Sequence, residues 1–191
     1  MRRLFVSVSA AIMLLGGIAV GAVVPTTAQE ATPAAAPNLT VGRLAPIGQP
    51  FEVVPGIDLE ILNEGHPANA PGLSLLLYRV TFRGGEVPTH MHPGTTVATV
   101  ESGTFSWNLL AGTVWVTRPG QAPEAVTEPG TELILNPGEG LIYHDDIVHG
   151  ARAAGDEPAV VLVTALFETG QPFLTVTDEH GTPIAAATPA P

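Results

Sequence analysis

The sequence predicts an all-β domain, either a sandwich or a small barrel. Short apolar runs alternate with turn residues, and no segment after residue 28 shows the 3.6-residue period of an amphipathic helix. The 191 residues include 21 glycines and 19 prolines, a composition that favours many turns over long helices. Many short strands separated by frequent turns are typical of sandwiches and small barrels.

Eleven segments show the strand pattern. They are residues 51–54, 57–62, 73–82, 95–101, 104–110, 114–118, 131–135, 140–143, 148–153, 159–167 and 173–177. Residues 159–167 are apolar on both faces, which indicates a strand covered on both sides. We therefore expect this segment to lie centrally in a sheet or next to the N-terminal strands.

Residues 1–28 are predicted to be an export signal. Two arginines follow Met1, residues 4–24 form an uncharged apolar run, and small residues follow at 26–28. A run of this length is also long enough for an uncleaved membrane anchor. Either interpretation predicts a secreted or extracytoplasmic protein, with membrane contact only through the N-terminal segment if it is not removed.

The remaining chain is predicted to be one domain with disordered ends. Residues 29–40 are an Ala/Pro/Thr-rich linker, and residues 179–191 end in a similar Ala/Pro tail. Such composition cannot build a core, so the β-domain is assigned to residues 41–178. It is large enough to fold without a disulfide.

Charge and composition exclude several classes of function. Without residues 1–28, five arginines remain against 18 acidic residues, a net charge of −13 that repels nucleic acid. The chain has no cysteine and no lysine, which excludes thiol catalysis, a lysine Schiff base and a phosphate-binding P-loop lysine. A Ser/His/Asp triad stays open, because serines are present at positions 74, 102 and 106, but none lies in a nucleophile motif.

His90 and His92 form a candidate metal-binding pair. In an extended strand, residues two apart point to the same face, so both imidazoles can bind one ion. The alternative is a pair of solvated histidines at a strand end. His66 and His180 lie in turn sequences and are expected to be exposed.

The frame around this pair resembles the first motif of the cupin family, G-x5-H-x-H-x3or4-E-x6-G. Gly84, the two histidines and Gly103 match that motif, and residues 138–153 resemble the second one, which places its histidine at His149. The resemblance implies a double-stranded β-helix, also called a jelly-roll barrel, with a metal bound by His90, His92 and His149. It also implies a homodimer, since cupins commonly pair.

The departures from the motifs concern the ligand set. Thr96 stands where the family has a glutamate ligand, and His144, Asp146 and Ala153 replace the proline, glycine and asparagine of the second motif. The resemblance thus implies either a three-histidine site, as in cupins that bind iron without the glutamate, or a site that has lost its metal. Three imidazoles without a carboxylate suit Fe, Cu, Ni or Zn and leave open positions on a divalent ion.

Several neighbouring side chains are candidates for supporting roles, each with a plainer alternative as a polar surface residue. Glu86 shares strand parity with His90 and is a candidate substitute ligand. Asp145 and Asp146 are candidates to bind the ion or orient a ligand histidine, and His144 to bind it or to move protons. Thr96 is a candidate hydrogen-bond donor to a metal-bound water.

Phe105, Trp107 and Tyr143 are candidate pocket-lining residues, the alternative being core packing or surface positions. Aromatic side chains at a barrel mouth would imply a small, partly apolar ligand. Two functions remain open, because this fold supports many. One is a metal-dependent, oxygenase-like enzyme acting on a small organic molecule, and the other is a non-catalytic module that binds a small ligand or a metal.

Overall fold

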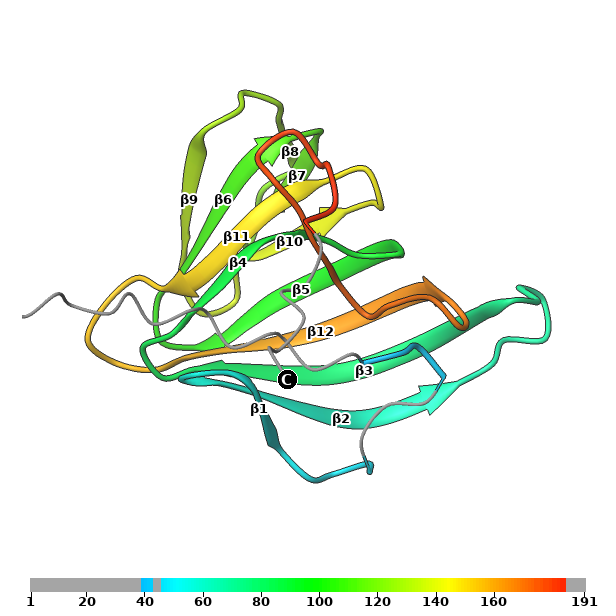
Figure 1. The fold of residues 1–191 in the computed structure, drawn as a ribbon. Coiled ribbons are helices and arrows are strands. Elements are labelled where there is room, and N and C mark those ends of the chain that lie inside the picture. The colour runs from blue at the N-terminus through cyan, green and yellow to red at the C-terminus, as the bar shows by residue number, and fades with distance from the viewer. Residues whose placement is uncertain (1–38, 43–45, 185–191) are drawn as a thin grey trace, which may run out of the picture. The chain divides into compact units, whose positions relative to one another are not determined.

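The computed structural model describes residues 39–42 and 46–184, which form thirteen β-strands and no α-helix (Figure 1). The predicted export signal, most of the linker and the end of the predicted tail lie outside the described residues. Within the described part, no helix is long and apolar enough to cross a membrane.

The strands form two antiparallel sheets. The larger sheet has the order β1-β2-β3-β12-β5-β10-β7-β8, with bounds Phe51–Val54, Ile57–Gly65, Leu73–Phe82, Ala159–Glu168, Gly94–Ser102, Gly140–Tyr143, Val114–Thr117 and Glu124–Val126. The smaller sheet has the order β13-β4-β11-β6-β9, with bounds Thr175–Val176, Glu86–Met91, Val148–Ala153, Phe105–Ala111 and Thr131–Leu135.

The strand order is that of a jelly roll. Eight of the strands divide into β3-β12-β5-β10 in the larger sheet and β4-β11-β6-β9 in the smaller one. The chain thus crosses repeatedly between the two sheets, as in the jelly rolls that include the cupins. The prediction of an all-β, cupin-like jelly-roll barrel is confirmed.

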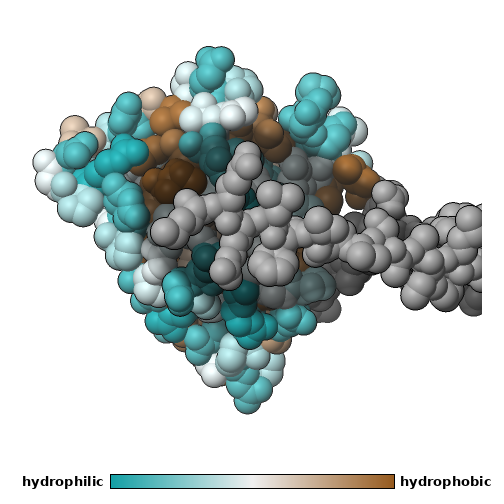
Figure 2. Space-filling view, turned by 90° about the vertical axis from the view of Figure 1, so that its left-hand side faces the viewer, coloured by the Kyte–Doolittle hydropathy of each residue, from teal (hydrophilic) through white to brown (hydrophobic). Residues whose placement is uncertain are grey.

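The core lies between the sheets, and β12 contributes to it by strict alternation. In β12, Ala159, Val161, Val163, Ala165 and Phe167 are buried, and the residues between them are more exposed. β12 pairs with both β3 and β5, so its predicted central position is also confirmed. On the outside, hydrophobic and hydrophilic residues are interspersed on the face that Figure 2 shows.

The sequence pattern missed two strands, β4 and β8. Residues 84, 85 and 88 are glycines and a proline, which normally mark turns. Pro88 is tolerated in β4 because it faces the irregular part of the β4–β11 ladder, between the pairs Val87–Ala151 and His90–His149. No N–H is required there, which is the usual setting for proline within a sheet.

Gly94 ties the start of β5 to β12. Its φ is +153°, and a Cβ at this position would lie 2.2 Å from the carbonyl oxygen of Leu166.

We expect Gly94→Ala to lower the free energy of unfolding by roughly 2 kcal/mol or more, because the backbone strain at this φ and the clash with the carbonyl oxygen add. Gly65→Ala is the matched control, since no atom lies within 4 Å of its added Cβ. Chemical denaturation of both variants checks this, and equal stabilities would contradict it.

Candidate metal centre

Three histidines converge in the barrel because of strand register. His90 lies in β4, His92 follows directly after this strand, and His149 lies in β11. His90 and His149 are paired across the β4–β11 ladder. Paired residues in an antiparallel ladder have Cβ atoms about 5 Å apart. Strand register thus brings His90 and His149 together, and His92, two residues after His90, lies at the end of the same strand.

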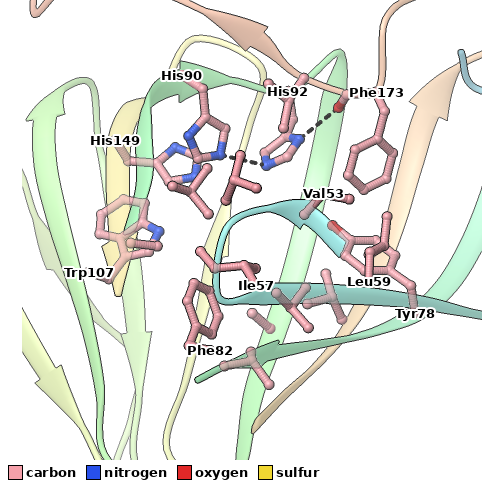
Figure 3. A pocket seen from close by; sticks show the side chains of 18 of the residues that line it. Val53, Ile57, Leu59, Tyr78, Phe82, His90, His92, Trp107, His149 and Phe173 are labelled. Atoms are coloured by element: carbon pink, nitrogen blue, oxygen red, sulfur yellow. Dashed lines mark hydrogen bonds between the residues drawn. The ribbon is translucent and has the colours of Figure 1, made fainter. Parts of the chain in front are cut away.

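The three imidazoles are buried and close together. His90, His92 and His149 are 3%, 9% and 2% exposed, and one nitrogen from each lies within 4.8 Å of the other two. Figure 3 shows the three rings grouped along one side of a pocket. Buried polar groups normally have partners, so each ring nitrogen is expected to have one.

Two backbone carbonyls determine the tautomers of His90 and His92. Nδ1 of His90 lies 2.7 Å from the carbonyl oxygen of Pro88, and Nδ1 of His92 lies 2.8 Å from that of Phe173. A carbonyl oxygen only accepts, so both Nδ1 atoms must carry the hydrogen. In the neutral rings, both Nε2 atoms therefore present lone pairs.

These two Nε2 atoms face each other at 3.2 Å. Facing lone pairs repel unless a proton or a cation lies between them. Burial lowers the pKa of His90 to about 3, with a further contribution from His92, and burial lowers the pKa of His92 to about 4. Neither ring holds an additional proton at neutral pH, so the pair is suited to a cation.

The distance between the two Nε2 atoms also fits a metal ion bound to both. With nitrogen–metal bonds of about 2.1 Å, two nitrogens 3.2 Å apart subtend an angle of about 100° at the ion. This angle lies between those of octahedral and tetrahedral coordination. The donor set contains no carboxylate, because among the described residues the group consists of the three histidines alone.

His149 completes the group. Its Nδ1 is buried and has no hydrogen-bond partner in the described part of the chain. Burial, together with His90 and His92, holds its pKa well below the ordinary value. Its ring stacks on Trp107, with centroids 4.8 Å apart and an interplanar angle of 23°. The ring is thus neutral at physiological pH and held in orientation by packing.

Thr96, at the position of the cupin glutamate, is buried near this group. It is fully inaccessible, pairs with Tyr143 across β5 and β10, and its hydroxyl has no hydrogen-bond partner among the described residues. A threonine here supplies no negative charge, so the three neutral imidazoles face the cavity without a counter-ion.

The other candidate residues lie outside this cavity. Glu86 is exposed at the far end of β4, about 13 Å along the strand from His90, although the two share parity. His144, Asp145 and Asp146 are exposed in the β10–β11 loop, where Nδ1 of His144 lies 3.1 Å from the hydroxyl of Thr95. None of these four side chains belongs to the group of ligand atoms within 4.8 Å of one another, although Asp145 and His92 both line a second cavity.

An apolar cavity of about 90 Å³ adjoins the three histidines. The aromatic candidates Phe105, Trp107 and Tyr143 all line it and are all buried. The lining residues that the sequence patterns did not single out include Tyr78 on β3 and Phe173 just before β13. Phe173 acts on His92 through its backbone carbonyl, which leaves no side-chain signal in the sequence.

Comparison with known proteins found structural similarity only. No family model and no curated protein matches the chain. KdgF from Halomonas sp. matches with a TM-score of 0.42 and 23% identity, over 61% of this chain and 84% of that one. An RmlC-like cupin from Shewanella frigidimarina matches with a TM-score of 0.36 and 18% identity, over 62% of this chain and 82% of that one.

Salicylate 1,2-dioxygenase from Pseudoaminobacter salicylatoxidans, in complex with gentisate, matches with a TM-score of 0.43 and 17% identity. The match covers 62% of this chain and 27% of the dioxygenase chain. The chain thus resembles a β-fold that occurs in a cupin and within a larger enzyme, and these similarities carry no information on its own substrate.

The lowered pKa values predict a dependence of stability on pH. In the unfolded metal-free chain, His90 and His92 take up protons near pH 6.5, whereas their folded-state pKa values of about 3 for His90 and about 4 for His92 keep both rings neutral well below that pH. The free energy of unfolding is therefore expected to fall between pH 7 and pH 5, by on the order of 2 kcal/mol for each buried histidine.

Urea denaturation of the metal-free protein at several pH values measures this dependence. His90→Gln should flatten it, while His66→Gln, which changes an exposed histidine, should not. Equal slopes in the wild type and the His90 variant would contradict the assignment of a buried, neutral His90.

Proposed function

We propose that residues 41–178 form a cupin domain that binds one divalent transition-metal ion through His90, His92 and His149. The observation that carries this proposal is the pair of Nε2 lone pairs facing each other at 3.2 Å, with both Nδ1 atoms engaged by carbonyls. The jelly-roll topology and the two motif-like stretches support it.

The donor set suits Fe, Cu, Ni or Zn, which accept imidazole ligands, better than Mg or Ca, which prefer oxygen. Once bound, such an ion would supply Lewis-acid or oxygen-activating chemistry at its open positions. The carbonyls of Pro88 and Phe173 fix the orientation of two ligand rings, and Trp107 and Phe167 pack against His149 and His92. Most of the other side chains that line the cavity are apolar.

An oxygenase-like enzyme acting on a small organic molecule is the first functional class that we propose. An apolar cavity beside a metal with open positions supports it, since such a cavity retains a small substrate next to the ion.

A non-catalytic module that binds a small ligand or metal is the second class. It is favoured by a specific observation, which is that no Asp, Glu, Lys or Arg lines the cavity to act as an acid or a base. Oxygen or substrate consumption that depends on His90 and His92 would support the enzyme, and saturable binding without turnover would support the module.

Export to the outside of the cell is part of the proposal and rests on residues 1–28. If that segment is not cleaved, it would also be the only contact with the membrane. The homodimer stays a prediction from the cupin resemblance.

Metal content tests the proposed site. We expect about one equivalent of Fe, Cu, Ni or Zn in the purified chain after reconstitution, and none in the His90→Ala/His92→Ala/His149→Ala variant. Elemental analysis measures both, and His66→Ala/His180→Ala is the matched control because both of its histidines are exposed. An unloaded wild type after reconstitution with each metal, or equal loading of the triple variant, would overturn the proposal.

A further inference from the structure

The polar side chains of the cavity wall are few and uncharged. Apart from the three imidazoles, the lining side chains with a polar atom are, among the described residues, Tyr78, Trp107 and Tyr143. Every other lining side chain in that part of the chain is apolar, and none of them bears a carboxylate or a guanidinium. The cavity therefore offers a small number of polar contacts within hydrocarbon walls, as is typical of specific small-molecule sites.

These three groups are hydrogen-bond donors. A tyrosine phenol ordinarily has a pKa near 10, so Tyr78 and Tyr143 carry an O–H at physiological pH, and the indole of Trp107 has only an N–H to offer. A ligand that satisfies them needs oxygen acceptors.

The two phenols come from the sheet opposite the one that carries His90 and His149, whereas Trp107 lies on β6, in the same sheet as His149. Tyr78 and Tyr143 come from β3 and β10 of the larger sheet, whereas His90 and His149 come from β4 and β11 of the smaller one. Figure 3 shows the imidazoles on one side of the pocket, and Ile57, Leu59 and Phe82 apart from them. A molecule between the sheets can thus reach a bound ion and a phenol together.

The volume limits the size of that molecule. An apolar cavity of about 150 Å³ holds benzene, which has six non-hydrogen atoms. At about 90 Å³, this cavity has room for a ligand of on the order of four non-hydrogen atoms by the same proportion.

Charge selects among small oxygen ligands. Three neutral imidazoles leave the full charge of a divalent ion uncompensated, and no carboxylate lines the cavity to offset it. The chain as a whole is acidic, with a net charge of −11. At physiological ionic strength, however, exposed charges are screened over about 8 Å, so the buried ion dominates inside the barrel.

We propose that the cavity binds a short-chain monocarboxylate of two or three carbons, with its oxygens toward the bound ion and toward the hydroxyls of Tyr78 and Tyr143. This inference rests on the proposed metal site. It narrows the ligand to a small monoanion and assigns the two phenols a role in positioning it.

We test this inference by titrating the Co(II)-loaded full chain with acetate, hexanoate and benzoate and recording its visible absorption. We expect acetate to change the spectrum saturably, and the two larger acids to have no effect at the same concentrations. Tyr78→Phe and Tyr143→Phe should each weaken acetate binding about tenfold or more, as expected for the loss of a hydrogen bond to a charged group. Trp115→Phe is the control, because Trp115 is 41% exposed and does not line the cavity.

Cobalt stoichiometry and thermal unfolding of each variant show that the site and the fold are retained. Val163→Ala, which enlarges the cavity at a lining residue, should extend binding to butanoate. If cobalt binds but acetate and benzoate act equally, or if neither tyrosine variant changes acetate binding, the carboxylate site is overturned and the metal site stands. If neither cobalt nor Fe, Cu, Ni or Zn binds, both are overturned.

Discussion

The site depends on two hydrogen bonds from imidazole N–H groups to backbone carbonyls. Pro88 and Phe173 accept from Nδ1 of His90 and His92, and this turns the Nε2 lone pairs of both rings toward each other. Burial disfavours an additional proton on either ring. The protein thus holds a preorganised arrangement that a cation completes.

The jelly roll makes this arrangement possible. One carbonyl comes from β4 itself, and the other comes from the segment before β13, 81 residues after His92. β13 pairs with Met91 and His90, which places Phe173 beside the H-x-H pair. His149 reaches the same point through its register with His90 on β11. Long-range strand pairing therefore positions His90 and His149, and a long-range hydrogen bond to the Phe173 carbonyl orients His92, so the site exists only when these distant segments have come together.

Much of the fold and the three central residues could be predicted from the sequence. Alternating apolar residues identified most strands, and the motif-like spacing identified His90, His92 and His149. The strand that carries His90 was missed, since Pro88 and the glycines before it have the local chemistry of a turn. The positions of Glu86, His144, Asp145 and Asp146 relative to the cavity could not be predicted, because parity gives the face of a strand but not the distance along it. Tyr78 and the Phe173 carbonyl act through tertiary contacts that leave no local pattern.

The tautomeric state of the metal-free protein tests the central claim most directly. Long-range ¹H–¹⁵N NMR correlations of the histidine rings distinguish Nδ1–H, Nε2–H and doubly protonated forms. The account predicts that His90 and His92 are both neutral Nδ1–H tautomers at pH 7. If either ring were an Nε2–H tautomer, the 3.2 Å distance between the two Nε2 atoms would be that of an ordinary hydrogen bond. If either ring were doubly protonated, its additional proton would occupy the position proposed for the cation. Either result would contradict the account.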